Sequence, residues 1–198
     1  MTTAAELVRD FVNTYDVEAD SDELASPAEL AVWLRERGLV SADDRAGEED
    51  LALAVGLREG LRTTLRHHHD RAGTPAERPA GTPVGTAPEP FSPQLDAALA
   101  ALPLRISVPP GGPLLVPAVD GTAGGLAAIA AAVAGAHAEG AWPRLKVCAE
   151  STCQWAFIDS SKNRSRAWCS MKVCGNRTKT RAYRARQVVE RPSRHSRR

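Results

Sequence analysis

Four cysteines near the C-terminal end constrain this chain more than any other feature. Cys148 and Cys153 form one pair and Cys169 and Cys174 a second, each with four residues between its members, and fifteen residues separate the pairs. This spacing is typical of a structural zinc site, in which four thiolates complete a closed tetrahedron. Two disulfides or four free core thiols are the alternatives. The chain shows no secretory leader, and thiols in a reducing cytosol do not stay oxidised. We therefore expect a cytoplasmic protein with one structural Zn2+ ion.

Charge is segregated along the chain. From Trp142 to the end there are fifteen Lys and Arg residues against three acidic ones, a net charge of +12, whereas residues 1–141 carry 10 basic and 21 acidic residues, a net charge of −11. A polyanion, most commonly nucleic acid, is the partner that such a basic segment favours. There are two alternatives. In one, the basic segment serves only to keep the chain in solution; in the other, it binds the acidic N-terminal half of the same chain.

Apolar spacing in the first 141 residues predicts a mainly helical domain packed through Leu, Val and Ala. Ser26 followed by Pro27 is typical of a helix start and Gly38 of a helix end, and Thr122 is expected to cap an alanine-rich helix. The expected helices cover about 4–15, 27–38, 45–69, 93–101 and 122–139.

Three further segments of this region have distinct patterns. Residues 104–108 and 114–119 predict two strands of a β-hairpin, since a Pro- and Gly-rich turn joins them. Residues 72–90 hold five prolines, three glycines and three threonines without a hydrophobic period, so we expect a flexible loop. No run of about 18 uncharged apolar residues is evident, so we expect no membrane span.

Residues 142–190 predict a small zinc finger. A first knuckle, a short strand over 154–159, a second knuckle and a helix from about 178 to 190 resemble a treble-clef-like finger. About 45 residues cannot build a sufficient core alone, so metal binding is expected to be coupled to folding. The small core over the zinc is expected from Trp155, Phe157, Trp168 and Met171. Base stacking by one tryptophan is the alternative.

Polar and basic side chains of the finger are the candidate nucleic-acid contacts. Guanidinium groups bind phosphate through two parallel hydrogen bonds and can read guanine in the major groove. Three arginines of the final helix, Arg177, Arg181 and Arg184, are four and three residues apart and so share one face. The Asn176 side chain either caps this helix or contacts a base or a phosphate. The candidate set is Arg164, Arg166, Asn176, Arg177, Lys179, Arg181, Arg184 and Arg186.

The run Trp168-Cys-Ser-Met-Lys-Val-Cys-Gly-Asn-Arg177, followed by Lys179, resembles the signature of the CGNR zinc finger family. The motif that names the family is here Cys174-Gly175-Asn176-Arg177. The N-terminal region is similar to the ABATE domain that usually precedes this finger. The resemblance implies a stress-responsive transcription regulator of bacteria. The other matching segments are Cys148-x4-Cys153, Phe157-Ile-Asp159, Asp10-Phe-Val-Asn-Thr14 and Pro27-Ala-Glu-Leu-Ala-Val-Trp-Leu34.

We therefore expect an α+β protein in three parts. Residues 1–141 form an ABATE-like regulatory domain, mainly helical with a small β-hairpin and the loop at about 72–90. Residues 142–190 form the treble-clef-like CGNR finger with its basic helix, and residues 191–198 form a disordered basic tail.

We expect the protein to regulate transcription by binding nucleic acid, with double-stranded DNA as the leading candidate. We expect no membrane partner. The N-terminal domain is expected to sense a signal, such as a small-molecule effector, or to form a homodimer. An RNA-binding or protein-interaction zinc module is the alternative. We do not expect the protein to be an enzyme. A zinc ion held by four thiolates has no open coordination position for water or substrate, and the sequence shows no convincing pair of nucleophile and base.

Overall fold

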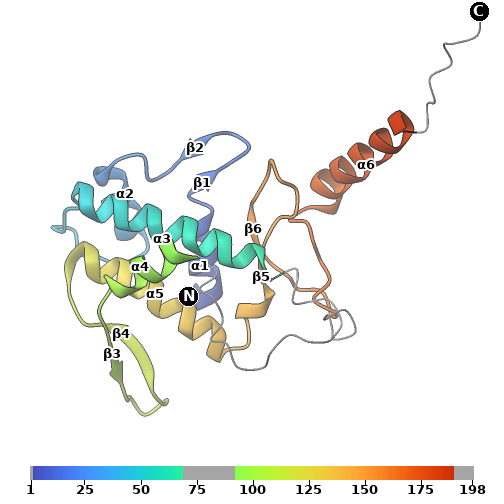
Figure 1. Cartoon of the computed structure of the whole chain (residues 1–198). Coiled ribbons are helices and arrows are strands. Elements are labelled where there is room, and N and C mark those ends of the chain that lie inside the picture. Colours follow the sequence, from blue (N-terminus) through green and yellow to red (C-terminus); the bar gives the residue numbers. More distant parts are fainter. Residues whose placement is uncertain (1, 69–91, 190–198) are drawn as a thin grey trace, which may run out of the picture.

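A computed structural model of the chain describes residues 2–68 and 92–189 (Figure 1). As expected, the described part is an α+β protein that is mainly helical, and its strands form three two-stranded antiparallel sheets. The expected loop at 72–90 and tail at 191–198 lie outside the described residues. In chain order the elements are α1 (Ala4–Val12), β1 (Tyr15–Asp16), β2 (Ser21–Asp22), α2 (Pro27–Glu36), α3 (Glu48–Arg66), α4 (Pro93–Ala100), β3 (Leu104–Ser107), β4 (Leu114–Pro117), α5 (Gly121–Ala138), η3 (Trp142–Arg144), β5 (Leu145–Val147), β6 (Ala156–Ile158), η4 (Met171–Gly175) and α6 (Asn176–Val189).

Local sequence signals set several helix ends. The Ser26 hydroxyl accepts a hydrogen bond from the Glu29 backbone N–H at 3.3 Å at the start of α2, and Gly38 follows its end with a φ of 68°. A left-handed residue at this place is the usual role of glycine after a helix. Helix α1 ends at Val12, three residues before its expected end, with Asn13 as its C-cap; the Asn13 side chain pairs with Ala156 of β6.

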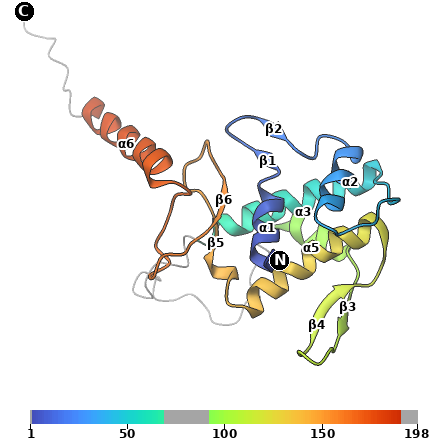
Figure 2. The same cartoon turned by 180° about the vertical axis from the view of Figure 1, so that it is seen from behind.

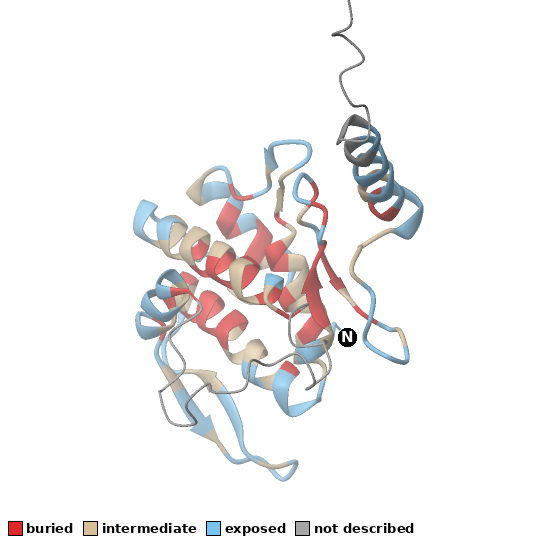
Figure 3. Ribbon diagram, turned by 45° about the vertical axis from the view of Figure 1, so that its right-hand side comes forward, coloured by how far each residue is buried: buried red, intermediate tan, exposed pale blue. Residues whose placement is uncertain are grey.

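The hydrophobic core lies between α1, α3 and α5 and appears red in Figure 3. Phe11, Leu57, Leu61, Leu126 and Ile129 are fully buried in it. Burial of one such side chain contributes roughly 1.5–3 kcal/mol. These positions recur at the three- and four-residue spacing that the apolar pattern predicts, so the helical core is as expected.

The start of α5 differs from the expectation. Thr122 is not its N-cap, because the helix begins one residue earlier, at Gly121, with Asp120 as the capping residue. The Thr122 hydroxyl instead donates to the Arg45 carbonyl oxygen at 3.0 Å. It therefore ties α5 to the segment that leads into α3.

Helix α5 also corrects the expectation about apolar runs. Its 18 residues have a mean hydropathy of 1.3, so by length and composition alone this helix could cross a membrane. In the structure it packs against α1, and 44% of its residues are buried inside the molecule. Its apolar character is that of a core helix.

The same core continues into the finger. Leu145 and Val147 of β5 and Ala156 of β6 are buried in one cluster with residues of α1 and α3. The first strand pair of the finger is therefore packed on the helical body, and the expected domain boundary at residue 141 stays a prediction. In contrast, α6 points away from the body in both views (Figures 1 and 2).

Candidate metal centre and basic helix

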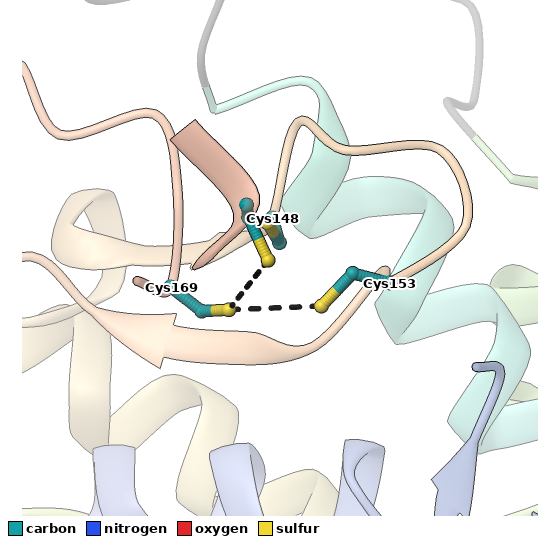
Figure 4. A group of neighbouring side chains, drawn as sticks. Cys148, Cys153 and Cys169 are labelled. Carbon is teal, nitrogen blue, oxygen red and sulfur yellow. Dashed lines mark hydrogen bonds between the residues drawn. The ribbon is translucent and has the colours of Figure 1, made fainter. Parts of the chain in front are cut away.

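The four cysteines predicted as zinc ligands converge on one point. Their Sγ atoms all lie within 4.8 Å of one another, and Cys148, Cys153 and Cys174 are buried. The Sγ atoms of Cys153 and Cys169 are 3.6 Å apart, and those of Cys169 and Cys174 are 3.7 Å apart. A tetrahedron with Zn–S bonds of about 2.3 Å has sulfur–sulfur edges of about 3.8 Å, so the cluster has the size of a four-thiolate zinc site. Figure 4 shows Cys148, Cys153 and Cys169 pointing toward the common centre.

The chemistry of the donor set fits zinc as well. Burial raises the pKa of the Cys153 thiol to about 12 when no ion is present, and it also raises the pKa of Cys169. Four crowded thiols ionise together only if a cation neutralises them, and Zn2+ deprotonates a coordinating thiol outright. The site has thiolate ligands on all four corners, which is the closed form typical of structural zinc.

Each knuckle is shaped by its own backbone hydrogen bonds. The Cys148 N–H donates to the Trp155 carbonyl at 2.9 Å, and the Cys153 N–H donates to the Glu150 carbonyl at 3.0 Å. In the second knuckle the Ser170 hydroxyl accepts from the Val173 N–H at 3.3 Å and so caps η4. Because β5 and β6 are paired, the first knuckle is a tight connection held at both ends by the core.

A buried ion pair organises the loop between the knuckles. The Lys146 ammonium lies 2.9 Å from Asp159 Oδ2, and the two side chains are 1% and 0% exposed. Burial alone would raise the pKa of Asp159, but hydrogen bonds from Ser161, Lys146 and the Arg166 backbone hold that pKa well below its usual range. Lys146 also donates to the carbonyl oxygens of Arg164 and Arg166. The pair therefore fixes the loop on which both arginines lie.

Glu150 performs the corresponding task for α6. Its carboxylate is buried and accepts from the Thr178 hydroxyl at 2.9 Å, from the Thr152 hydroxyl at 3.2 Å and from Arg181 at 2.9 Å. Burial favours a higher pKa, yet these hydrogen bonds lower the pKa of Glu150, so it stays ionised. Residue 150 belongs to the first knuckle and residues 178 and 181 to α6, so this carboxylate docks the helix on the zinc site.

The loop arginines of the predicted contact set have different surroundings. The Arg166 guanidinium donates to the carbonyl oxygens of Trp168 and Cys169 and lies 5.0 Å above the Phe157 ring. It therefore supports the second knuckle. The Arg164 backbone has a φ of 51°, and within the described residues its guanidinium has no hydrogen-bond or ion-pair partner.

The helical members of the set also divide into two groups. Arg177 donates to Glu18 Oε1 at 2.7 Å and to the Thr152 hydroxyl at 3.2 Å, and Arg181 pairs with Glu150. The Asn176 amide donates to the Lys172 carbonyl at 3.0 Å, so it contacts the preceding turn η4 and not the first backbone N–H groups of α6; its predicted roles as cap of the final helix or as nucleic-acid contact stay predictions. Lys179 and Arg184 are exposed and unpartnered within the described part of the chain. Arg186 lies on α6, and its side chain is outside the described residues.

Sequence reasoning missed the contacts between the finger and the helical body. The Asn13 side chain donates to the Ala156 carbonyl at 3.0 Å and accepts from the Ala156 N–H at 2.7 Å. The buried Arg62 donates to the Val12 carbonyl at 2.7 Å and to the Gln154 carbonyl at 3.1 Å. These residues showed no pattern that pointed to the finger, apart from the presence of Asn13 in a matching motif.

The aromatic residues only partly follow the prediction. Trp168 packs against the cysteine cluster, as expected. Phe157 is buried, but it lies beneath the Arg166 guanidinium and does not pack in that cluster. Trp155 and Met171 are 38% and 46% exposed, so their placement in a small core over the zinc was wrong.

Taken together, the geometry defines a zinc-finger protein with a helical N-terminal domain. Residues 144–187 match the model of the CGNR zinc finger, and residues 5–149 match the ABATE model, described as "Putative stress-induced transcription regulator". The chain therefore belongs to the ABATE family. The resemblance noted in the sequence is confirmed, and so is the expectation of one structural Zn2+ ion. No curated protein matches the sequence.

Proposed function

We propose that this regulator acts by binding double-stranded DNA through its zinc finger. The observation that carries the proposal is the basic surface of α6, a helix that leaves the body and is largely exposed (Figures 1 and 3). Lys179 and Arg184 are exposed on it, and Arg181 is 56% exposed although it pairs with Glu150. A single α-helix fits the major groove of B-form DNA. Phosphate neutralisation by Lys and Arg would supply most of the affinity.

In this proposal zinc has a structural role. It joins the second knuckle to the first, and Glu150 then holds the start of α6 on the first knuckle. The four thiolates leave no coordination position for water or substrate, so we propose no enzymatic activity at this centre. The zinc site and the Lys146–Asp159 pair together orient the basic helix and the loop at 160–166.

The N-terminal domain is proposed to regulate the finger inside the cytoplasm. A hollow of about 730 Å3 lies between the segment after α2, strand β4 and the start of α5, and Ser41, Asp44 and Arg105 are among its lining residues. This volume is within the range of small-molecule sites. An effector that binds there would be detected as a rise in the melting temperature of the zinc-loaded chain against a metabolite library.

The test of DNA binding is a fluorescence-anisotropy titration of the zinc-loaded full chain with duplex fragments at several salt concentrations. Replacing both Lys179 and Arg184 by alanine removes two exposed charges without touching the metal site. We expect weaker binding and a salt slope reduced by about 1.8, since each phosphate contact contributes about 0.9. Replacing Arg45 and Arg9, two basic residues of the N-terminal domain, is the matched control. Equal effects of both pairs would contradict the proposal.

RNA binding is the second candidate, and the exposure of Trp155 favours it. This side chain is 38% exposed beside the first knuckle, and base stacking requires an accessible ring and an unpaired base. Competition between duplex DNA and a single-stranded or structured RNA separates the two candidates. Trp155→Ala should weaken RNA binding strongly if stacking occurs, and should leave duplex binding nearly unchanged.

A further inference from the structure

An exposed apolar surface lies on the side of the molecule formed by the β3–β4 hairpin and α5. Ile106 and Leu115 are cross-strand partners, and they are 71% and 37% exposed. Leu114 at the start of β4 is 45% exposed, and Val108 just after β3 is 76% exposed. Scattered exposed apolar residues are ordinary, but Ile106 and Leu115 share one face of the hairpin, and clustered exposed apolar residues mark interaction sites. Leu114 pairs with Ser107 and so belongs to the opposite face of the strands.

The hairpin and the helix enclose a groove. Its volume is about 360 Å3, and the hairpin side is formed by Ile106 together with residues 113–115. The α5 side presents only small residues, Ala131, Ala134, Gly135 and Ala138. No charged residue of the described chain lines this groove. The molecule therefore has a protruding apolar hairpin directly beside an apolar groove whose floor is made of small side chains.

We propose that this surface binds a second copy of the chain, with the hairpin of each copy seated in the groove of the other. A two-fold arrangement requires a self-complementary patch, and a knob next to a hole meets that requirement. The absence of charge on the lining disfavours nucleic acid, which needs cations at its contacts. Arg105 does not change this, because it lies on the other face of β3 and lines the separate hollow near Ser41.

The available area suits a reversible dimer. The exposed hairpin residues and the small residues of α5 form a small surface, so a two-fold interface built from them lies at the lower limit of roughly 1,200 Å2 at which specific interfaces begin. An interface at this lower limit associates in the micromolar range more often than in the nanomolar range. The dimer would also place two basic helices in one particle, but this inference does not depend on DNA binding.

The experiment is sedimentation velocity of the zinc-loaded full chain, without nucleic acid, from low to high micromolar concentration. We expect a monomer–dimer equilibrium. Ile106→Asp places a carboxylate on the knob, and Ala134→Trp fills the groove with the chain's own side chain. Each variant should raise the dissociation constant of the dimer by about 100-fold or more. With Ile106→Asp the interface would bury an unpaired charge, and with Ala134→Trp the groove would no longer have room for the partner's hairpin. Val32→Asp, at a 47% exposed position on α2, is the matched control and should dimerise like the wild type.

Folding is checked separately, by circular dichroism and the melting temperature of each dilute variant. Since Ile106 is 71% exposed, its replacement should leave the monomer folded. A wild-type chain that stays monomeric at every concentration overturns the inference. So does a dimer that withstands either Ile106→Asp or Ala134→Trp. Because the samples contain no DNA, failure here is distinguishable from failure of the proposed DNA binding.

Discussion

Replacing Glu18 by glutamine is expected to strengthen DNA binding. Glu18 follows β1 in the N-terminal domain, and its carboxylate accepts a hydrogen bond from Arg177 at 2.7 Å. Arg177 is the arginine of the CGNR motif, so a carboxylate of the same chain occupies the guanidinium that a DNA phosphate would bind. In the proposed DNA complex, contact of a phosphate with Arg177 requires that this ion pair break first.

The magnitude follows from the exposure of the two side chains. Arg177 and Glu18 are 34% and 49% exposed, so solvent screens the pair strongly. Exposed ion pairs contribute about 0.2–1 kcal/mol, which corresponds to a gain in affinity of about 1.4- to 5-fold when the competitor is removed. The gain should be largest at low salt, because at about 0.1 M the Debye length is only about 10 Å.

The assay is an anisotropy titration with one duplex fragment, comparing Glu18→Gln with Glu23→Gln. Glu23 lies on the same segment just after β2, and it has no ion pair within the described residues, so its replacement controls for the loss of one negative charge. In an Arg177→Ala background the gain from Glu18→Gln should disappear. Equal gains from both glutamine variants, or a gain that persists without Arg177, would refute the reasoning.

Four further predictions concern the fold and the metal. Asp159→Asn should lower the free energy of unfolding by about 3–5 kcal/mol, measured with urea at saturating zinc, because Lys146 stays buried without its counter-charge. The stabilisation by Asp159 should be lost as the pH falls below about 4, since its pKa is lowered in the folded state. Gly60→Ala should destabilise by about 1–3 kcal/mol despite the better helix propensity of alanine, because the added Cβ would lie 2.7 Å from the Leu95 Cα atom; an unchanged melting temperature would contradict this. Zinc affinity, measured against a competing chelator, should fall as the pH falls, because the metal displaces protons from buried thiols such as Cys153.

The sequence contained the local parts of this structure. The Ser26–Pro27 start and the Gly38 end of α2 depend on neighbouring residues only, so they could be predicted. The cysteine spacing likewise determines which thiolates share one ion, since each knuckle is a tight turn. The error at Thr122 arose because Asp and Thr are both favoured at N-cap positions, and the helix begins after Asp120, two residues earlier, although the Asp120 side chain makes no capping hydrogen bond.

Pairs that are distant in the chain could not be predicted. Asn13 meets Ala156, Arg62 meets Gln154, and Glu18 meets Arg177. The sequence around a polar side chain does not indicate which residue of a distant segment it will contact, because that contact depends on how the helices pack. For this reason the basic residues looked equivalent in the sequence, whereas in the structure Arg177 is engaged by a distant carboxylate and others of the set remain free within the described residues.

The continuity of the helical core with β5 and β6 has a consequence for assembly of the finger. Cys148 and Cys153 lie directly beside strands that are packed on α1 and α3, so the folded body brings half of the ligand set together. The ion then has to recruit only Cys169 and Cys174 with α6. A fragment that begins at residue 142 would therefore lack the scaffold that prepares its own binding site.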